Sequence, residues 1–559
     1  MRHWRINLIS FFIILIAAAI VSRLVYLQIL RGDLYKALAQ GQQKLFSQVQ
    51  GERGEIFLED KSGDLYKFAT NKDYPFLYAS PKRIKEKEKT AQVLSEVVGE
   101  DKDLILEKLK KDTFWQLIKN KLSDEEVASL QTLNLSGIYL SKNTLRYYPQ
   151  ETQASHVIGF ISGSGEGQYG VEGYYDEILR GGEELEEREK GPFGYFTFSI
   201  KNKENSGSRV ILTLDYNIQF MAEKLLKEAK EKWNIESGTI VVLDPDSGEI
   251  LALVNEPNFD LNLYSEVENL EVFQNSAIQK IFEPGSVFKP VIMAAALNEH
   301  KVAPQTKYID QGFVKIGGFT IYNYAHKVWG SKTMTEVLEQ SINTGAVFIE
   351  QQIGHKTFLD YIERFGFFEP SGIDLQGEVF SNNSELKKGY EINFATASFG
   401  QGIAITPIQL ARFFAAIANG GELVKPHVVK KIIKDSGEEI EFQVDKTRVM
   451  EQKTSSILTA MLVGVVENGI ARRAQIPGYF IAGKTGTAQI PYSDRRGYFP
   501  EQTIQSFVGF APAFNPEFLI MVKLDRPQGT PEASVSTVPI FRELARYIID
   551  YLGIPPDYE

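Results

Sequence analysis

The sequence predicts an α+β fold for residues 208–559, in which one antiparallel sheet is flanked by helices. Short apolar and β-branched runs, typical of strands, occur at both ends of this region. The middle of the region has a mostly helical pattern. Runs 239–243 and 249–254 are joined by the turn Asp244–Gly248, which predicts a hairpin. Strands at both ends with helices between them indicate one sheet covered by helices.

The other elements of this region follow from their local patterns. The run VILTL at 210–214 predicts a strand, and an amphipathic pattern predicts a helix over 218–233. Similar patterns return near the C-terminal end of the chain. They predict strands at 479–482, 506–511 and 518–524 and a last helix over 539–552.

The whole chain has 559 residues, which is too many for one core, so two or three domains are expected. Residues 31–50 are predicted to form a polar helix, and short strands and turns begin near residue 51. The Lys- and Glu-rich segment 84–130 has helical periodicity and predicts a solvated helical subdomain. The polar stretch 201–207 predicts a domain boundary.

The N-terminus carries a membrane signal. Residues 6–21 are almost wholly apolar, and the apolar pattern resumes at 24–30 after Arg23. A bilayer core of about 30 Å needs about 20 helical residues, which the combined run 6–30 supplies if Arg23 reaches the interface. A cleaved signal peptide with Ala17–Ala19 as its small-residue site is the alternative. We predict a cytoplasmic tail at 1–5 and an anchor at 6–30, although lysines and arginines on both sides leave the orientation open.

Composition excludes several classes of function. The net charge of −11 argues against a nucleic-acid partner, which would need a basic face. Cysteine is absent, so thiol catalysis and thiolate metal sites are excluded. The six histidines are scattered, and none forms an H-x-x-x-H pair. Neither a zinc site nor any other metal or cofactor is therefore predicted.

The stretch GYFIAGKTGTAQ, residues 478–489, matches the phosphate-loop pattern G-x-x-x-x-G-K-[ST]. A phosphate loop is a flexible turn that leads into a helix. Here three bulky strand-forming residues precede Gly483, and the sequence after Thr485 cannot start a convincing helix. We therefore predict that Lys484 lies on a strand and serves other chemistry. An edge-strand charge is the plain structural alternative.

A second candidate for chemistry is Ser286, which follows the turn Pro284-Gly285 and opens an apolar helix over 287–297. Lys289 lies three residues later on the same helix face. A desolvated lysine can act as general base for a serine nucleophile. Alternatively, Ser286 is an N-cap and Lys289 a surface residue, since such a chain should contain about two S-x-x-K tetrads by chance.

A third element is Ser341-Ile342-Asn343, where two polar residues break the apolar helical stretch 337–352. A simple helix bend is the alternative for this element. S-x-x-K, S-x-N and K-T-G occur in this order in penicillin-binding proteins and class A β-lactamases, with Asp in place of Ile342. Each element alone is common, whereas all three in order and in suitable contexts are specific.

On these motifs the chain resembles a class B penicillin-binding protein of the division or sporulation type, over nearly its full length. Further segments resemble family elements: Arg53–Ile56, Arg146–Phe160, Gly170–Glu172, Ser237–Leu253, Ser398–Gly402 and Thr406–Leu410. The chain departs from the family where Phe57-Leu58-Glu59 precede the turn Asp60–Gly63. The resemblance implies a pedestal domain at 31–207 and a serine penicillin-recognising transpeptidase domain at 208–559.

The resemblance also implies a D,D-transpeptidase that cross-links peptidoglycan stem peptides and is acylated by β-lactams. Ser286 would be the nucleophile and Lys289 its base. Ser341 and Lys484 would relay a proton, and Asn343 would hold the donor amide. Thr485, Gly486 and Thr487 would belong, with Lys484, to the strand that binds the donor carboxylate.

Partners and alternatives are implied in the same way. The family pairs such a chain with a polytopic SEDS-type glycosyltransferase in a division or elongation complex at the cell membrane, with a septal role favoured. Hydrolases of the same family, a D,D-carboxypeptidase or a β-lactamase, are one alternative. A non-catalytic β-lactam sensor or divisome scaffold is another.

Overall fold

The computed structural model describes residues 44–50, 52–133, 135–191, 194–198, 206–492, 495 and 497–558. They form two compact units. The smaller unit contains a three-stranded antiparallel sheet in the order β1-β8-β9. Its strands are β1 (Lys44–Gln50), β8 (Glu183–Gly191) and β9 (Gly194–Phe198). All elements described below belong to the larger unit, apart from the last residues of one short helix.

The prediction of a helix over 31–50 is wrong for residues 44–50. Lys44–Gln50 is a strand that pairs with β8 from Lys44↔Glu189 to Gln50↔Glu183. Pairing with so distant a segment is invisible to local propensity, which tertiary context overrides. The tail 1–5 and the anchor 6–30 lie outside the described residues. None of the helices within the described ranges is long and apolar enough to cross a membrane.

The predicted antiparallel sheet is confirmed as five strands in the order β12-β11-β23-β22-β21. The strands are β11 (Ser237–Leu243), β12 (Ile250–Glu256), β21 (Ala482–Pro491), β22 (Tyr498–Ala511) and β23 (Phe518–Asp525). The strand predicted at 479–482 begins only at Ala482. The strand predicted at 210–214 exists, but it pairs outside this sheet.

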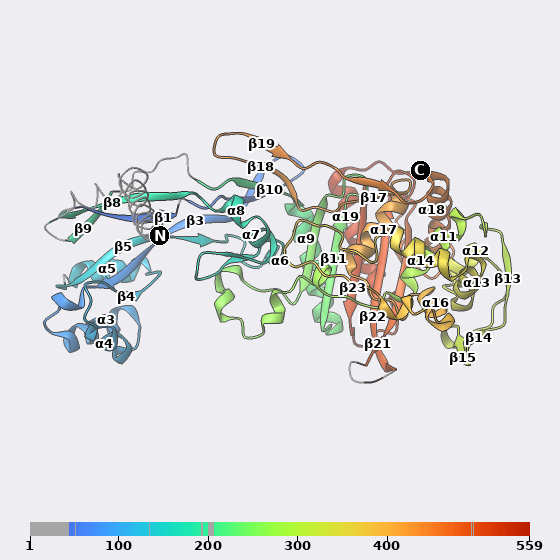
Figure 1. Ribbon diagram of the computed structural model, residues 1–559, viewed down its shortest axis with the longest axis horizontal. Coiled ribbons are helices and arrows are strands. Elements are labelled where there is room, and N and C mark those ends of the chain that lie inside the picture. Colours follow the sequence, from blue (N-terminus) through green and yellow to red (C-terminus); the bar gives the residue numbers. More distant parts are fainter. Residues whose placement is uncertain are drawn as a thin grey trace, which may run out of the picture. The chain divides into compact units, whose positions relative to one another are not determined.

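Helices cover the five-stranded sheet, as predicted (Figure 1). Helices α9 (Tyr216–Trp233) and α19 (Thr537–Leu552) pack against each other and against β11, β12, β22 and β23. Helix α17 (Pro407–Ala418) packs against β11, β22 and β23. Strand β23 is consequently buried along almost its whole length.

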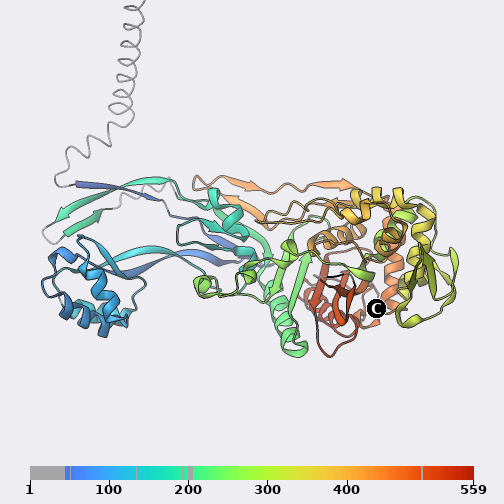
Figure 2. The same ribbon diagram turned by 60° about the horizontal axis from the view of Figure 1, so that its bottom comes forward.

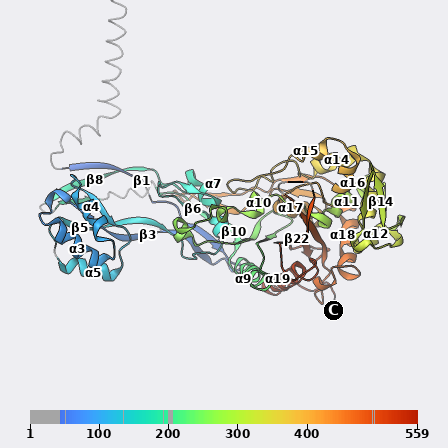
Figure 3. The same ribbon diagram turned by 90° about the horizontal axis from the view of Figure 1, so that it is seen from below.

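The middle of the chain forms a helical layer beside the sheet. Figure 3 shows α11, α12, α16, α18 and β14 grouped together at one end of this region. Its helices are α11 (Lys289–Asn298), α12 (Met334–Glu339), α13 (Asn343–Ile353), α14 (His355–Arg364), α15 (Ser384–Lys387), α16 (Glu391–Ala397) and α18 (Gln452–Glu467). The short helix α10 (Ser276–Gln279) packs instead against α17, β11 and β12.

Short strands and 3-10 turns complete this part of the chain, and Figure 2 shows the paired strands beside the helical layer. The antiparallel pairs are β13 (Lys307–Asp310) with β16 (Gly330–Thr333), β14 (Phe313–Ile316) with β15 (Phe319–Tyr322), and β17 (Glu422–Val424) with β20 (Lys446–Arg448). The 3-10 turns are η4 (Leu261–Glu266), η5 (Leu270–Phe273), η6 (Gly285–Phe288), η7 (Tyr324–His326) and η8 (Arg472–Ala474).

A second, mixed sheet joins N-terminal and C-terminal segments of the chain. Its order is β19-β18-β10-β2-β3-β4, with β5 also on β3. The strands are β2 (Ile56–Glu59), β3 (Leu65–Ala79), β4 (Gln116–Lys119), β5 (Ile138–Tyr147), β10 (Arg209–Asp215), β18 (Val429–Ile433) and β19 (Glu439–Glu441). Strands β2 and β10 are parallel neighbours, so segments on both sides of residue 207 share one sheet.

The turn between β2 and β3 contains the residues that depart from the family pattern. The Asp60 Oδ1 atom accepts hydrogen bonds from the backbone N–H groups of Ser62 and Asp64, at 2.8 and 3.1 Å. An aspartate that binds its own backbone in this way initiates a turn. The altered sequence therefore still supports a tight hairpin.

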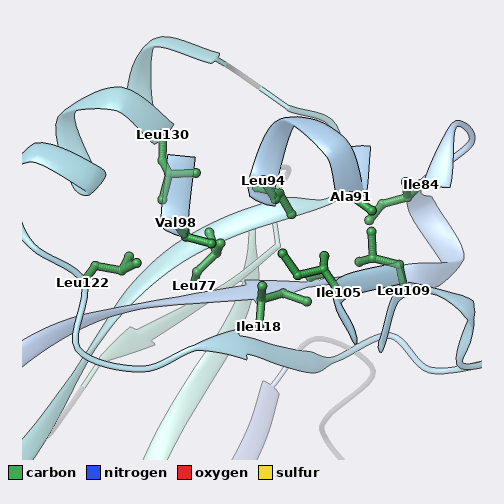
Figure 4. Close-up of a cluster of buried hydrophobic side chains, with 11 residues drawn as sticks. Leu77, Ile84, Ala91, Leu94, Val98, Ile105, Leu109, Ile118, Leu122 and Leu130 are labelled. Atoms are coloured by element: carbon green, nitrogen blue, oxygen red, sulfur yellow. The ribbon is translucent and has the colours of Figure 1, made fainter. Parts of the chain in front are cut away.

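The predicted helical subdomain is confirmed and has its own core. Helices α3 (Lys87–Val98), α4 (Lys102–Lys110) and α5 (Asp124–Leu133) follow the turn η2 (Pro81–Arg83). Figure 4 shows side chains from these helices meeting Leu77 of β3 and Ile118 of β4. The segment 116–119 is a strand rather than part of a helix because it pairs with β3.

Two of the family-like segments meet in a buried ion pair. Arg146, at the end of β5, donates from Nε to Glu172 Oε1 at 2.6 Å, and their side chains are 6% and 0% exposed. Glu172 lies in α7 (Gly170–Tyr174). The neighbouring short elements are α6 (Ser155–Ile158), β6 (Phe160–Ile161), β7 (Gly167–Gln168) and α8 (Asp176–Leu179).

We expect Glu172→Gln to lower the free energy of unfolding by about 3 kcal/mol, because it leaves the buried guanidinium of Arg146 without its counter-charge. Urea unfolding of the full chain in detergent measures this. Lys388→Ala is the control, since it breaks a pair with Glu385 whose side chains are 52% and 68% exposed; such pairs contribute at most about 1 kcal/mol. Equal shifts for both variants would contradict the expectation.

Candidate active site

The turn that carries Ser286 is held against the rest of the domain by glycines. Ser286 lies in η6, immediately before α11. Gly285 N–H donates to Gly400 O at 2.9 Å, and a Cβ on Gly400 would lie 2.1 Å from Gly285 O. Gly400 is thus required for this close backbone approach. The N-cap alternative for Ser286 is wrong, because Pro284 and Phe288 occupy the N-cap positions of η6 and α11.

Lys289 is buried, with 1% of its surface exposed, so the surface-residue alternative is wrong. Its Nζ lies 3.0 Å from Ser286 Oγ. The same Nζ donates to Ser341 O at 2.6 Å and to Asn343 Oδ1 at 2.8 Å, and lies 3.1 Å from Ser341 Oγ. Three of the predicted site residues therefore surround one amine.

The partners of Lys289 determine what its amine can do. A carbonyl oxygen and an amide oxygen can only accept hydrogen bonds. The amide of Asn343 turns its oxygen Oδ1 toward Lys289, because its nitrogen Nδ2 donates to Tyr322 O at 3.1 Å. In a neutral Lys289, the two N–H bonds are used by Ser341 O and Asn343 Oδ1. The remaining lone pair can then accept only from a hydroxyl, and two hydroxyls are within reach, Ser286 Oγ at 3.0 Å and Ser341 Oγ at 3.1 Å.

Ser341 lies in the break between α12 and α13, as the polar residues predicted. Its φ is +56°, a left-handed conformation that costs a non-glycine residue about 1–3 kcal/mol. The conformation places its Oγ between the two lysines, at 3.1 Å from Lys289 Nζ and 3.0 Å from Lys484 Nζ. The hydroxyl therefore connects the two amines.

Lys484 lies on β21, as predicted, and β21 continues to Pro491, so the phosphate-loop alternative is wrong. The strand is at the edge of the sheet, yet Lys484 is 0% exposed. Besides Ser341, its Nζ contacts Thr485 O at 3.1 Å and Thr485 Oγ1 at 3.5 Å. The lysine thus points into the protein beside Ser341 instead of into solvent.

The rest of this strand contacts the turn that carries Ser286 and a distant loop. A Cβ on Gly486 would lie 2.8 Å from Pro284 O and 3.0 Å from Val287 Cβ, so glycine lets the turn of Ser286 lie against β21. Thr487 Oγ1 accepts a hydrogen bond from Ala533 N–H at 3.3 Å. The hydroxyl hydrogen of Thr487 is therefore left to donate to another group.

Burial lowers the pKa of both lysines. The pKa of Lys289 lies well below its usual range because the amine is desolvated and, secondarily, because Lys484 is close. Desolvation lowers the pKa of Lys484 to about 7. Each amine is therefore neutral at a lower pH than an exposed lysine would be.

The structure brings Ser286, Lys289, Ser341, Asn343 and Lys484 into one hydrogen-bonded cluster. Thr485, Gly486 and Thr487 follow Lys484 on β21. Sequence reasoning missed a buried group behind Asn343, formed by Asp310, Asn323 and Thr344. The turn signal Asp310-Gln311-Gly312 could have indicated the first of these.

Comparison with known proteins agrees with this geometry. The sequence model described as the penicillin binding protein transpeptidase domain matches residues 238–546. The model described as the penicillin-binding protein dimerisation domain matches residues 48–212. The first match alone spans more than half of the chain and contains every predicted site residue.

Two curated relatives and one solved structure are similar over most of their length. Stage V sporulation protein D of Bacillus subtilis is 31% identical over 99% of this chain and 86% of its own length. The peptidoglycan D,D-transpeptidase FtsI homolog of Mesostigma viride is 28% identical over 97% and 94%. Penicillin binding protein 3 of Mycobacterium tuberculosis, solved with aztreonam, has a TM-score of 0.70 and 26% identity over 91% and 98%. The chain belongs to the penicillin-binding protein family and carries that family's transpeptidase domain.

Proposed function

We propose that this penicillin-binding protein cross-links peptidoglycan as a serine D,D-transpeptidase, with Ser286 as its nucleophile. The observation that carries the proposal is the 3.0 Å contact between Ser286 Oγ and an amine whose two N–H bonds are already used by Ser341 O and Asn343 Oδ1. Lys289 takes the proton as Ser286 attacks the carbonyl between the terminal D-alanines of a stem peptide. The C–N bond breaks, D-alanine leaves with a proton, and an amine of a second stem attacks the ester.

The remaining site residues bind the donor stem. The second N–H of Asn343 Nδ2, beyond the one given to Tyr322 O, donates to the donor amide. Lys484, Thr485 and Thr487 bind the terminal carboxylate, and the hydroxyl of Thr487 is oriented for this by Ala533 N–H. Ser341 relays a proton between the lysines and the leaving amine. The backbone N–H groups of Ser286 and Thr487 form the oxyanion hole, and each such donor contributes about 10²–10³ in rate.

We expect a bell-shaped pH dependence for acylation by penicillin, measured as the second-order rate constant from pH 5 to 9.5. The rising side reports loss of the Lys289 proton, whose pKa is lowered. The falling side reports loss of the Lys484 charge near its pKa of about 7 in the free enzyme. Lys484→Arg keeps a permanent charge, so its falling side should disappear. A falling side that stays in place would assign it to another group.

The proposed function also implies a domain organisation, a cellular location and a membrane partner. We place a tail at 1–5, an anchor at 6–30, a pedestal at 31–207 and the transpeptidase domain at 208–559. The two matched family models, 48–212 and 238–546, support this division. The catalytic domain then works outside the cell membrane beside a polytopic SEDS-type glycosyltransferase, at the division septum. β-Lactams acylate Ser286 as mimics of the donor.

Product analysis tests the proposed reaction against the hydrolytic and non-catalytic alternatives. Purified full chain is incubated with a D-Ala-D-Ala stem peptide and an amine acceptor, and products are separated by mass. We expect released D-alanine and a cross-linked product in equal amounts. Release of D-alanine with only the shortened peptide would indicate a carboxypeptidase. No release from enzyme that is acylated by penicillin, with the membrane partner present, would indicate a sensor or scaffold.

A further inference from the structure

The N-terminus of α13, which carries Asn343, is held from outside its own helix. Ile342 occupies the N-cap and has no side-chain acceptor for the first N–H groups. Asn323 Oδ1, directly after strand β15, accepts from Thr344 N–H at 3.1 Å. The preceding carbonyl, Tyr322 O, accepts from Asn343 Nδ2 at 3.1 Å. Two consecutive residues, the last of β15 and the one after it, thus hold the first two residues of α13.

A buried carboxylate fixes this arrangement. Asp310 Oδ1 accepts from Thr344 Oγ1 at 2.7 Å and from Asn323 Nδ2 at 3.0 Å. Its Oδ2 accepts from Asn323 Nδ2 at 3.0 Å and from Trp329 N–H at 2.7 Å. Asp310, Asn323 and Thr344 are 2%, 4% and 6% exposed. Because an ionised carboxylate only accepts hydrogen bonds, it keeps Nδ2 of Asn323 toward itself and Oδ1 toward Thr344.

We propose that Asp310, Asn323 and Thr344 are positioning residues that hold Asn343 so that its Oδ1 orients the Lys289 amine toward Ser286. This inference rests on the proposed function, since it assigns a role in the acylation step. The three side chains lie outside the cluster of reacting groups and act on it only through Asn343 and the Tyr322 carbonyl.

The expected effect is larger on the acylation step than on binding of the inhibitor. Misplacing a catalytic group by about 1 Å can lower a rate about 10²-fold. We therefore expect Asn323→Ala to lower the saturating rate of acylation by about 10- to 100-fold. The penicillin concentration at half-saturation should change less than this rate, because Lys484, Thr485 and Thr487 on β21 remain to bind the carboxylate.

The hydroxyl of Thr344 offers a matched pair of variants. Thr344→Val keeps the side-chain shape but removes the O–H donor to Asp310, and it should lower the same rate several-fold. Thr344→Ser keeps the donor and should restore the wild-type rate. Thr320→Val, on the exposed side of the hairpin β14–β15, is the control for changes in this region.

The experiment measures acylation of the full chain in detergent by a fluorescent penicillin, over a range of concentrations, together with each variant's melting temperature. A lower saturating rate in Asn323→Ala and Thr344→Val, with Thr344→Ser normal, supports the proposal. An unchanged rate in the folded molecules of these variants, even at lower melting temperature, overturns it and leaves a structural role. If wild type itself is not acylated at Ser286, the proposed function fails instead.

Discussion

Ser286→Ala should not be labelled by a fluorescent penicillin under conditions that label the wild-type chain completely. The alanine has no Oγ to form the acyl ester, and the two lysines of the cluster are buried and point toward Ser341. Loss of a nucleophile in such a cluster costs about 10⁶ in rate. The measurement is the labelled band of the purified chain on a denaturing gel.

A matched control makes this result specific. Ser456→Ala removes an exposed serine from α18, and its labelling should equal that of wild type. The melting temperature of Ser286→Ala should also equal that of wild type, because the half-buried serine contributes only one contact to Lys289. A folded Ser286→Ala that is still labelled in full would assign the acylated nucleophile to another residue.

The sequence predicted the elements that carry the site better than it predicted how they pair. The hairpin 239–254, the strands at 506–511 and 518–524 and the last helix have strong local patterns and are confirmed, whereas the strand predicted at 479–482 begins only at Ala482. Strand β10 was correctly located at 210–214, but its partners β2 and β18 are far away in sequence. Pairing over such distances depends on tertiary contacts that no local pattern contains.

In the candidate site, too, local features were predictable from the sequence and long-range contacts were not. Ser286, Lys289 and Asn343 are recognisable because their spacing has a chemical reason. The burial of Lys289 is not recognisable, because a lysine in S-x-x-K is equally consistent with an exposed residue. Asp310 and Asn323 escape sequence reasoning because their function depends on meeting Thr344 across 34 and 21 residues. In the sequence, Asp310 is only part of a local turn motif and Asn323 is only a polar residue after a strand, and neither pattern indicates that contact.

Gly400 and Gly486 hold the turn of Ser286 through close backbone contacts. Both glycines lie where another backbone approaches: a Cβ on Gly400 would meet Gly285 O at 2.1 Å, and one on Gly486 would meet Pro284 O at 2.8 Å. The two contacts hold the turn of Ser286 from two sides. We therefore infer that both glycines are needed for the turn of Ser286 to take up its position in the site.

Lys289→Met should retain binding of penicillin but lose acylation. Loss of a general base lowers a rate by about 10²–10⁴, so the saturating acylation rate should fall by that factor while the half-saturating concentration changes little. Lys301→Met, at an exposed site after α11, is the matched control. Stopped-flow measurement with a chromogenic β-lactam separates the two quantities.

Lys289→Arg distinguishes a base from a positive charge. The guanidinium remains protonated at every accessible pH, so it cannot accept the Ser286 proton. If Lys289 acts as a base, the arginine variant should be as inactive as the methionine variant. Recovery of the acylation rate in Lys289→Arg would show instead that the positive charge near Ser286 is what matters.

Stability gives an independent check of the same protonation state. Burial lowers the pKa of Lys289 in the folded protein, whereas in the unfolded chain it is about 10.4. The unfolded chain therefore binds a proton that the folded chain does not, which costs stability at low pH, and this cost disappears as pH rises toward the unfolded pKa. Lys289→Met removes the cost, so its melting temperature should exceed that of wild type by more at pH 6 than at pH 9. A difference independent of pH would mean that Lys289 is charged in the folded protein and cannot serve as the base.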